Sequence, residues 1–275
     1  MTDSNSQSFH LPPGTQGELR FHTLSSHCFG NARQLRVWLP PGYSSPQNEG
    51  RRYPVLYLND GQNLFDPATA FAGVDWHVSE SLTRLIGEEQ VPPMIVVGID
   101  NAAVERIREF LPYKALYPPV PKPLGKRYPD FLIEEIIPLI QRAYRVARGA
   151  SNTGLGGSSL GALIALYTAM ARPGIFGRLL LESPSLFVSN RRLLKDSRMV
   201  SAWPQRVFLG IGTKESGQRE RDQRIVDDVR ALAHSFGLAG LREKRLRVEV
   251  QEGATHCEAA WADRFPRAVT FLFGK

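Results

Sequence analysis

Cysteine is scarce in this chain: there are two, Cys28 and Cys257, among 275 residues. This excludes a disulfide scaffold, and their spacing does not match a zinc-binding knuckle. The sequence also has no apolar run long enough to span a bilayer. Residues 1–9 lack the basic and apolar regions of a signal peptide. We therefore expect a cytoplasmic protein with no membrane partner and no metal site.

Acidic residues are outnumbered: 34 Lys and Arg residues stand against 27 Asp and Glu residues, a formal net charge of +7. The basic clusters are mixed with acids along expected helices, a pattern typical of solvated faces. No nucleic-acid-binding motif accompanies them, so we expect no nucleic-acid partner. The surplus positive charge would favour anionic substrates by steering. The composition leaves homo-oligomer formation open.

Apolar periodicity predicts an α/β chain, with a flexible tail over residues 1–17 and a single domain over residues 18–275. From residue 55 onward, buried strand patterns alternate with helical ones. This predicts a mostly parallel sheet with helices on both faces, preceded by antiparallel N-terminal strands. The expected strands are Leu19–Thr23, Leu35–Leu39, Val55–Asn59, Met94–Asp100, Arg178–Glu182, Val207–Ile211 and Leu246–Val250. The expected helices include Asp75–Ile86, Tyr128–Tyr144 with a kink at Pro138, Gln218–Phe236 and Glu258–Phe273.

Residues 112–129 interrupt this alternation with a proline-rich loop that also carries several basic residues. A loop of this length inside a compact domain is often functional. Two interpretations stay open: the segment lines or covers an active site, or it is a surface insertion without a role.

The run Gly157-Ser158-Ser159-Leu160-Gly161 matches the G-x-S-x-G nucleophile elbow with Ser159 at its centre. A weak strand pattern precedes the run and an apolar helix follows it, as the motif requires. At such a turn the serine hydroxyl points out of the sheet at a helix N-terminus, where developing negative charge is stabilised. Ser158 fits less well, because Leu160 stands where the turn would then need glycine.

A serine nucleophile needs a base, and the base needs an orienting acid. In α/β-hydrolases the chain order is serine, acid, histidine. His256, a few residues past the last expected strand, fits the base. His234 lies within a charged helix pattern, and the remaining histidines precede the elbow: His10, His22, His27 and His77.

Glu215 is the preferred acid, because it follows the strand Val207–Ile211 in a loop at the carboxyl edge of the expected sheet. Glu182, at the end of the strand after the elbow helix, is a lesser alternative. Four further acids fall on or near an expected helix and are interpreted as solvated: Glu220, Asp222, Asp227 and Asp228.

An oxyanion hole needs two backbone N–H groups aimed at the tetrahedral oxygen. One is expected from Leu160, the residue after the nucleophile. The other is expected from Gln62, in the loop after the strand Val55–Asn59, where Gly61 allows close backbone approach.

Together these residues resemble the esterase family of α/β-hydrolases that includes the esterase D type, siderophore trilactone esterases, feruloyl and acetyl-xylan esterases and mycolyl-transferring relatives. The resemblance covers nearly the whole chain from about Leu35. One departure is Ala162, where relatives usually carry a second glycine. The motifs that carry the resemblance are Tyr57–Asp66, Asp75-Trp76, Val96–Asn101, Arg106 with Glu109–Pro112, Gly156–Gly161, Glu182–Ser185, Gly212–Glu215 and His256 with Trp261.

The resemblance implies an α/β-hydrolase fold, the same Ser159, His256 and Glu215 triad, and oxyanion donors at Gln62 and Leu160. It also places Asp60 and Arg106 near the substrate, with the role of Arg106, binding or structural, left open. The implied function is a serine carboxylic ester hydrolase that acts through an acyl-enzyme on small acyl, aryl or siderophore-type esters. Its partner is a small-molecule ester, and no cofactor is needed. A non-catalytic α/β-hydrolase-like binding module and an acyltransferase are the alternatives.

Overall fold

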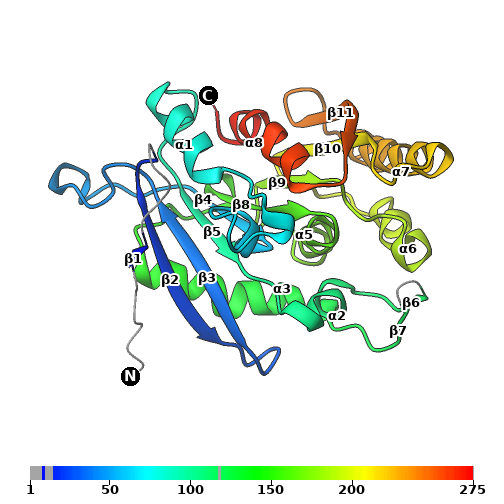
Figure 1. Ribbon diagram of the computed structural model, residues 1–275, viewed down its shortest axis with the longest axis horizontal. Coiled ribbons are helices and arrows are strands. Elements are labelled where there is room, and N and C mark those ends of the chain that lie inside the picture. Colours follow the sequence, from blue (N-terminus) through cyan, green and yellow to red (C-terminus); the bar gives the residue numbers. More distant parts are fainter. Residues whose placement is uncertain (1–7, 10–14, 117–118, 275) are drawn as a thin grey trace.

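The computed structural model describes residues 8–9, 15–116 and 119–274. Its centre is a nine-stranded sheet of order β1-β2-β3-β5-β4-β8-β9-β10-β11 (Figure 1). The first pairings, β1 with β2, β2 with β3 and β3 with β5, are antiparallel, and all later ones are parallel. The strands are β1 Ser8–Phe9, β2 Glu18–Ser25, β3 Ala32–Leu39, β4 Val55–Asn59, β5 Ile95–Ile99, β8 Thr153–Ser158, β9 Arg178–Glu182, β10 Arg206–Lys214 and β11 Leu246–Thr255.

Helices cover both faces of this sheet because its central strands are apolar on both sides. Along β4, Val55 and Tyr57 belong to one core cluster, whereas Leu56 and Leu58 belong to the other. Successive side chains of a strand point to opposite faces, so each face needs its own cover. The cover of the second cluster is α1 and α8, and the other helices pack into the first (Figure 1). The helices are α1 Val78–Gly87, α2 Arg106–Phe110, α3 Tyr128–Asp130, α4 Ile137–Ala143, α5 Leu160–Ala171, α6 Val188–Ser197, α7 Arg219–Leu238 and α8 Glu258–Phe273.

The predicted fold class, a mostly parallel α/β sheet after an antiparallel start, is confirmed. Most of the predicted N-terminal tail lies outside the described residues, although Ser8 and Phe9 within it pair with β2. None of the described helices is long and apolar enough to cross a membrane.

The predicted continuous helix Tyr128–Tyr144 is wrong in detail. The structure has α3, then a π-helical stretch Phe131–Ile136, then α4. Pro138 lies in the first turn of α4. Because proline has no N–H, the carbonyl of Glu134 loses its helical partner. The irregular hydrogen bonding therefore lies in the turn before Pro138, where the prediction had a simple kink.

The sequence analysis also missed α2, α6 and the short hairpin of β6 (Ala115–Leu116) and β7 (Pro119–Val120). Strands of two residues and a helix of five are too short to show a periodic apolar pattern. The hairpin lies within the proline-rich segment, whose residues 117 and 118 are outside the described part.

Leu58 tests how far the central strand holds the fold together. Its side chain is fully buried, and β4 is paired on both sides. We expect Leu58→Ala to lower the free energy of unfolding by about 2–5 kcal/mol, because the substitution loses apolar burial and leaves a cavity. Leu238→Ala is the matched control, since Leu238 is 75% exposed at the end of α7. Equal urea midpoints for the two variants would contradict this packing.

Candidate functional site

The turn between β8 and α5 holds Ser159 in a strained backbone conformation, with φ 56° and ψ −122°. Such conformations cost of order 1–3 kcal/mol and persist only where the surroundings enforce them. Here the Ser159 N–H donates to the carbonyl of Glu182 on the neighbouring strand at 2.9 Å. Ser159 therefore lies at the N-terminus of α5 with its hydroxyl outside the sheet.

The two motif glycines are required by close contact with the end of β4. A Cβ on Gly161 would lie 2.8 Å from Asp60 Oδ2, and a Cβ on Gly157 would lie 3.0 Å from the Cβ of Asn59. Asn59 Nδ2 also donates to the Gly161 carbonyl at 2.7 Å. The spacing of the motif thus follows from the approach of two parallel strands at their carboxyl ends.

The structure brings Ser159, His256 and Glu215 into one hydrogen-bonded line, although 97 residues separate Ser159 from His256. The Oγ of Ser159 lies 3.0 Å from Nε2 of His256. The Nδ1 of His256 lies 2.5 Å from Oε2 of Glu215. The Glu215 side chain is 1% exposed and that of His256 is 34% exposed, so the line runs from the protein interior to solvent.

Glu215 is held by two further donors. Its Oε1 accepts from the Gly212 N–H at 2.7 Å and from Ser183 Oγ at 2.8 Å. Ser183 in turn accepts from the indole Nε1–H of Trp261 at 2.9 Å. The Trp261 ring also stands edge-on to the His256 imidazole, with centroids 5.0 Å apart. Glu215 and Trp261, which both contact His256, are therefore linked to each other through Ser183.

Sequence reasoning gave no role to Ser183 or Ser185, and both touch this line. Ser185 Oγ lies 3.2 Å from Ser159 Oγ, and the Ser185 N–H donates to the Ser159 carbonyl. The signal was a run of small polar residues directly after the buried strand next to the elbow strand. Parallel neighbours end at the same sheet edge, so this run had to lie beside the serine.

The alternative acid, Glu182, has another partner. Its Oε2 accepts from Arg264 Nε at 2.8 Å, and both side chains are fully buried. Ser158, the alternative serine, is buried at the end of β8. Two of the acids predicted to be solvated are instead buried: Asp222 accepts from Ser216, and Asp228 pairs with Arg191.

Asp60 and Arg106, both predicted near the substrate, bind each other. Arg106 Nε and Nη2 donate to the two carboxylate oxygens of Asp60 at 2.6 and 2.8 Å. Asn101 Nδ2 donates to the same carboxylate. Burial lowers the Arg106 pKa, but the Asp60 charge and hydrogen bonds outweigh it and raise the pKa above its ordinary value. The pair fixes α2 to the end of β4.

Gln62 lies in a 3₁₀ turn, Gly61–Asn63, directly after β4. Its side-chain Oε1 accepts from the Asn101 N–H at 3.2 Å, and its carbonyl accepts from Thr69 Oγ1. A Cβ on Gly61 would lie 2.5 Å from the Gly98 carbonyl carbon, so only glycine allows this turn to pass so close to β5. Leu160 begins α5, where the first N–H groups have no helical acceptor.

A pocket of about 370 Å³ opens in front of Ser159 and His256. Its polar wall includes Glu258, which sequence reasoning missed although it lies two residues after His256. Glu258 is buried, accepts from Asn63 Nδ2 at 3.2 Å, and has its pKa raised by burial. The full lining is Asp60, Gln62, Asn63, Phe71, Asn101, Ala103, Val104, Arg106, Ile107, Ser158, Ser159, His256, Glu258 and Trp261.

Within the described part of the chain, one group has the composition of a metal site: Asp75, His77 and Glu80, with donor atoms within 4.8 Å of one another. Asp75 Oδ2 accepts from the His77 backbone N–H, and His77 Nδ1 lies 3.1 Å from Asp75 Oδ1.

A serine in a strand-to-helix turn of a mostly parallel sheet, with Glu215 and His256 just after later strands, is the arrangement typical of the α/β-hydrolase class. Residues 26–272 match the family described as "Putative esterase". The chain belongs to this esterase family, and its activity is that of a hydrolase of ester bonds.

Two relatives and one solved structure give the range of similarity. YbbA from Bacillus subtilis (strain 168) is 26% identical over 92% of this chain and 97% of its own length. An endo-1,4-beta-xylanase/feruloyl esterase from Xylanibacter ruminicola is 26% identical over 94% of this chain but 31% of its own length. The enterobactin esterase FES from Shigella flexneri superposes with a TM-score of 0.74 at 20% identity, over 94% of this chain and 60% of that one.

The buried Glu182 makes stability depend on pH. Burial raises its pKa from 4.5 to about 7, against the opposing effect of Arg264. Between these values the folded state keeps a proton that the unfolded state releases. The stability contributed by this group is therefore complete below pH 4.5 and is lost as the pH rises to about 7.

We expect Glu182→Gln to remove this dependence. The free energy of unfolding of the wild type, measured relative to the variant, should fall by about 3 kcal/mol from pH 4 to pH 8. Urea unfolding at a series of pH values measures it, with Glu252→Gln on the exposed part of β11 as control. Parallel curves for wild type and Glu182→Gln would show that Glu182 keeps its ordinary titration.

Proposed function

We propose that this chain is a serine carboxylic ester hydrolase that works through an acyl-enzyme. The observation that carries the proposal is the line Ser159 Oγ, His256 Nε2, His256 Nδ1, Glu215 Oε2, with separations of 3.0 and 2.5 Å. A base within hydrogen-bond reach of the hydroxyl, itself oriented by a carboxylate, is what activates serine at neutral pH.

In the first half-reaction, Ser159 Oγ forms a bond to the ester carbonyl carbon while its proton moves to His256 Nε2. The C=O π electrons move onto the carbonyl oxygen. When the tetrahedral intermediate collapses, the bond to the alcohol oxygen breaks and His256 gives that oxygen the proton. In the second half-reaction, water gives a proton to His256 as it attacks the acyl carbon, and Ser159 leaves with the proton returned. The scheme uses no cofactor.

We assign the oxyanion hole to the backbone N–H groups of Leu160 and Gln62. Leu160 is the first residue of α5, so its N–H and the positive end of the helix dipole face the same oxygen. Gln62 follows Gly61 in the turn beside the serine. Loss of one such donor typically costs about 3 kcal/mol of transition-state stabilisation.

For the substrate we propose a small acyl or aryl ester, with a siderophore-type ester as the second candidate. The pocket has an apolar side that includes Phe71, Val104 and Ile107, which suits an acyl chain or an aromatic ring. The relatives named for feruloyl ester and enterobactin hydrolysis support both candidates. Faster turnover of p-nitrophenyl acetate than of a catecholate trilactone would exclude the siderophore candidate.

The pocket lining itself carries no surplus positive charge. Arg106 is neutralised by Asp60, and Glu258 adds a carboxyl group. Steering by the +7 net charge therefore acts at long range and does not continue into the pocket. This favours neutral esters over anionic ones at the reacting centre.

The decisive test compares Ser159→Ala with Ser158→Ala. We expect Ser159→Ala to lower kcat for p-nitrophenyl acetate by about 10⁶-fold and to abolish fluorophosphonate labelling. Ser158→Ala should keep both, because His256 Nε2 hydrogen-bonds with Ser159, whereas Ser158 is buried at the end of β8 although it contributes to the pocket lining. If the wild type, Ser159→Ala and Ser158→Ala all behave alike, the serine mechanism is wrong and a non-catalytic binding module becomes the better hypothesis. Net ester formation with an added alcohol would instead support an acyltransferase.

A further inference from the structure

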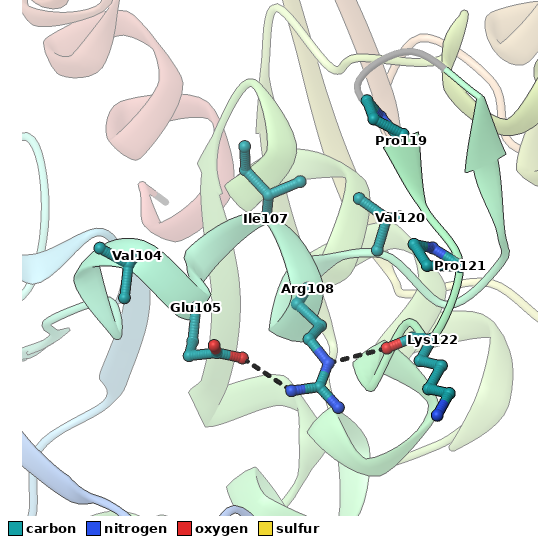
Figure 2. Close-up of a pocket in the computed structure, with 8 residues that line it drawn as sticks. All are labelled: Val104, Glu105, Ile107, Arg108, Pro119, Val120, Pro121 and Lys122. Carbon is teal, nitrogen blue, oxygen red and sulfur yellow. Dashed lines mark hydrogen bonds and ion pairs between the residues drawn. The ribbon is translucent and has the colours of Figure 1, made fainter.

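A second pocket, of about 420 Å³, lies beside the reactive pocket and shares two wall residues with it. The shared residues are Val104, in the 3₁₀ turn Ala103–Glu105 that precedes α2, and Ile107, within α2. The pocket is completed by Glu105, Arg108, Pro119, Val120, Pro121 and Lys122. Figure 2 shows the α2 segment on one side and the stretch from Pro119 to Lys122, which begins with β7, on the other.

The shared wall is apolar, exposed and held in place. Val104 is 94% exposed and Ile107 is 36% exposed. The helix α2, which carries Ile107 and follows the turn of Val104, is anchored by the ion pairs of Arg106 with Asp60 and of Glu109 with Arg33, the latter pair 1% exposed. An exposed apolar surface on a rigid support beside a pocket marks a binding site.

The opposite wall is also apolar and preordered. Pro119 and Pro121 have fixed φ angles, and Val120 between them is largely buried. A wall of this kind loses little conformational entropy when a ligand covers it. The proline-rich segment therefore supplies a surface to a site next to the serine.

Two of the three charged side chains that line this pocket, Glu105 and Arg108, pair with each other. Arg108 Nη1 donates to Glu105 Oε2 at 3.1 Å, and Arg108 Nε donates to the backbone carbonyl of Lys122 at 2.9 Å (Figure 2). An apolar ligand can therefore enter without breaking these two bonds.

We propose that this second pocket is a subsite for a distal apolar group of the ester that Ser159 attacks. The substrate class is then an elongated ester whose uncleaved end, alkyl or aromatic, passes over Val104 and Ile107 and lies against Pro119–Pro121. The proposal rests on the proposed esterase function and adds to it a preference for length.

The test uses two matched pairs of substrates. p-Nitrophenyl octanoate against p-nitrophenyl acetate extends the acyl side, and a biphenylyl acetate against phenyl acetate extends the alcohol side. For each pair the measured quantity is the ratio of kcat/KM for the long ester to that for the short one. The wild type should have a ratio above one in at least one pair.

Pro121→Asp is the main variant, because Pro121 is exposed and lines the second pocket but not the reactive pocket. A carboxylate there should lower the favourable ratio at least tenfold, since the apolar group would have to displace its water. Val104→Asp, at a 94% exposed position, should lower the same ratio. Leu116→Asp is the control: Leu116 is 83% exposed on the same hairpin but does not line the pocket, and it should leave both ratios unchanged.

The possible results separate this inference from the function beneath it. Ratios that change less than twofold in both Pro121→Asp and Val104→Asp, while p-nitrophenyl acetate is still cleaved, overturn the subsite and leave the esterase intact. An equal fall in Leu116→Asp also overturns it, because the effect would then come from the hairpin as a whole. If the wild type cleaves none of the four esters, the proposed function fails and the subsite with it.

Discussion

The close approach of the elbow to the end of β4 is the constraint on which the site depends. Gly157 and Gly161 leave no room for a Cβ against Asn59 and Asp60. This contact, with the Asn59 bond to the Gly161 carbonyl, sets the position of the strained serine. The chain directly after β4 contains Asp60, which anchors α2 through Arg106, and Gln62, which lies in the turn beside Ser159. One strand end thus positions the proposed nucleophile, the proposed oxyanion turn and part of the wall of the pocket.

The side chain of His256, the proposed base, is held from two sides. Glu215 orients His256 through one oxygen and uses the other for Gly212 and Ser183, so the carboxylate has little freedom to rotate. Trp261 contacts both His256 and Ser183 and comes from α8, on the opposite face from α5. Residues at the start of α5 and within α8, which lie on opposite faces of the sheet, therefore both contact His256. This restraint suits the proposed role of His256, which must accept and return a proton.

The pocket in front of Ser159 has a polar wall on one side and an apolar rim on another. The polar wall is built from Asp60, Asn101 and Arg106, which satisfy one another. The apolar rim consists of Val104, in the turn before α2, and Ile107, in α2, and both side chains are exposed while Arg106 fixes α2 to Asp60. In this arrangement the proposed catalytic residues lie at the carboxyl edge of the sheet, and the proposed subsite is formed by α2, the turn before it and the hairpin that faces them.

Local sequence was enough to locate the serine, because the elbow turn needs small residues at fixed spacing and a helix pattern after it. It was also enough to propose His256 and Glu215, because chain order and strand ends put them at one sheet edge. The strands Val55–Asn59 and Arg178–Glu182 were predicted with their observed bounds, since fully buried strands are continuous apolar runs.

Only the tertiary structure decided the rest. Several features of the site depend on contacts between residues far apart in the chain. These are the pairing of Glu182 with Arg264, the pairing of Arg106 with Asp60, and the presence of Ser183 and Glu258 at the site. The proline-rich hairpin likewise lines a pocket only because α2 lies opposite it in the folded chain. Residue type and local spacing describe what a segment can form, whereas the partner that satisfies a buried charge or an exposed apolar face is chosen by the packing of the whole chain.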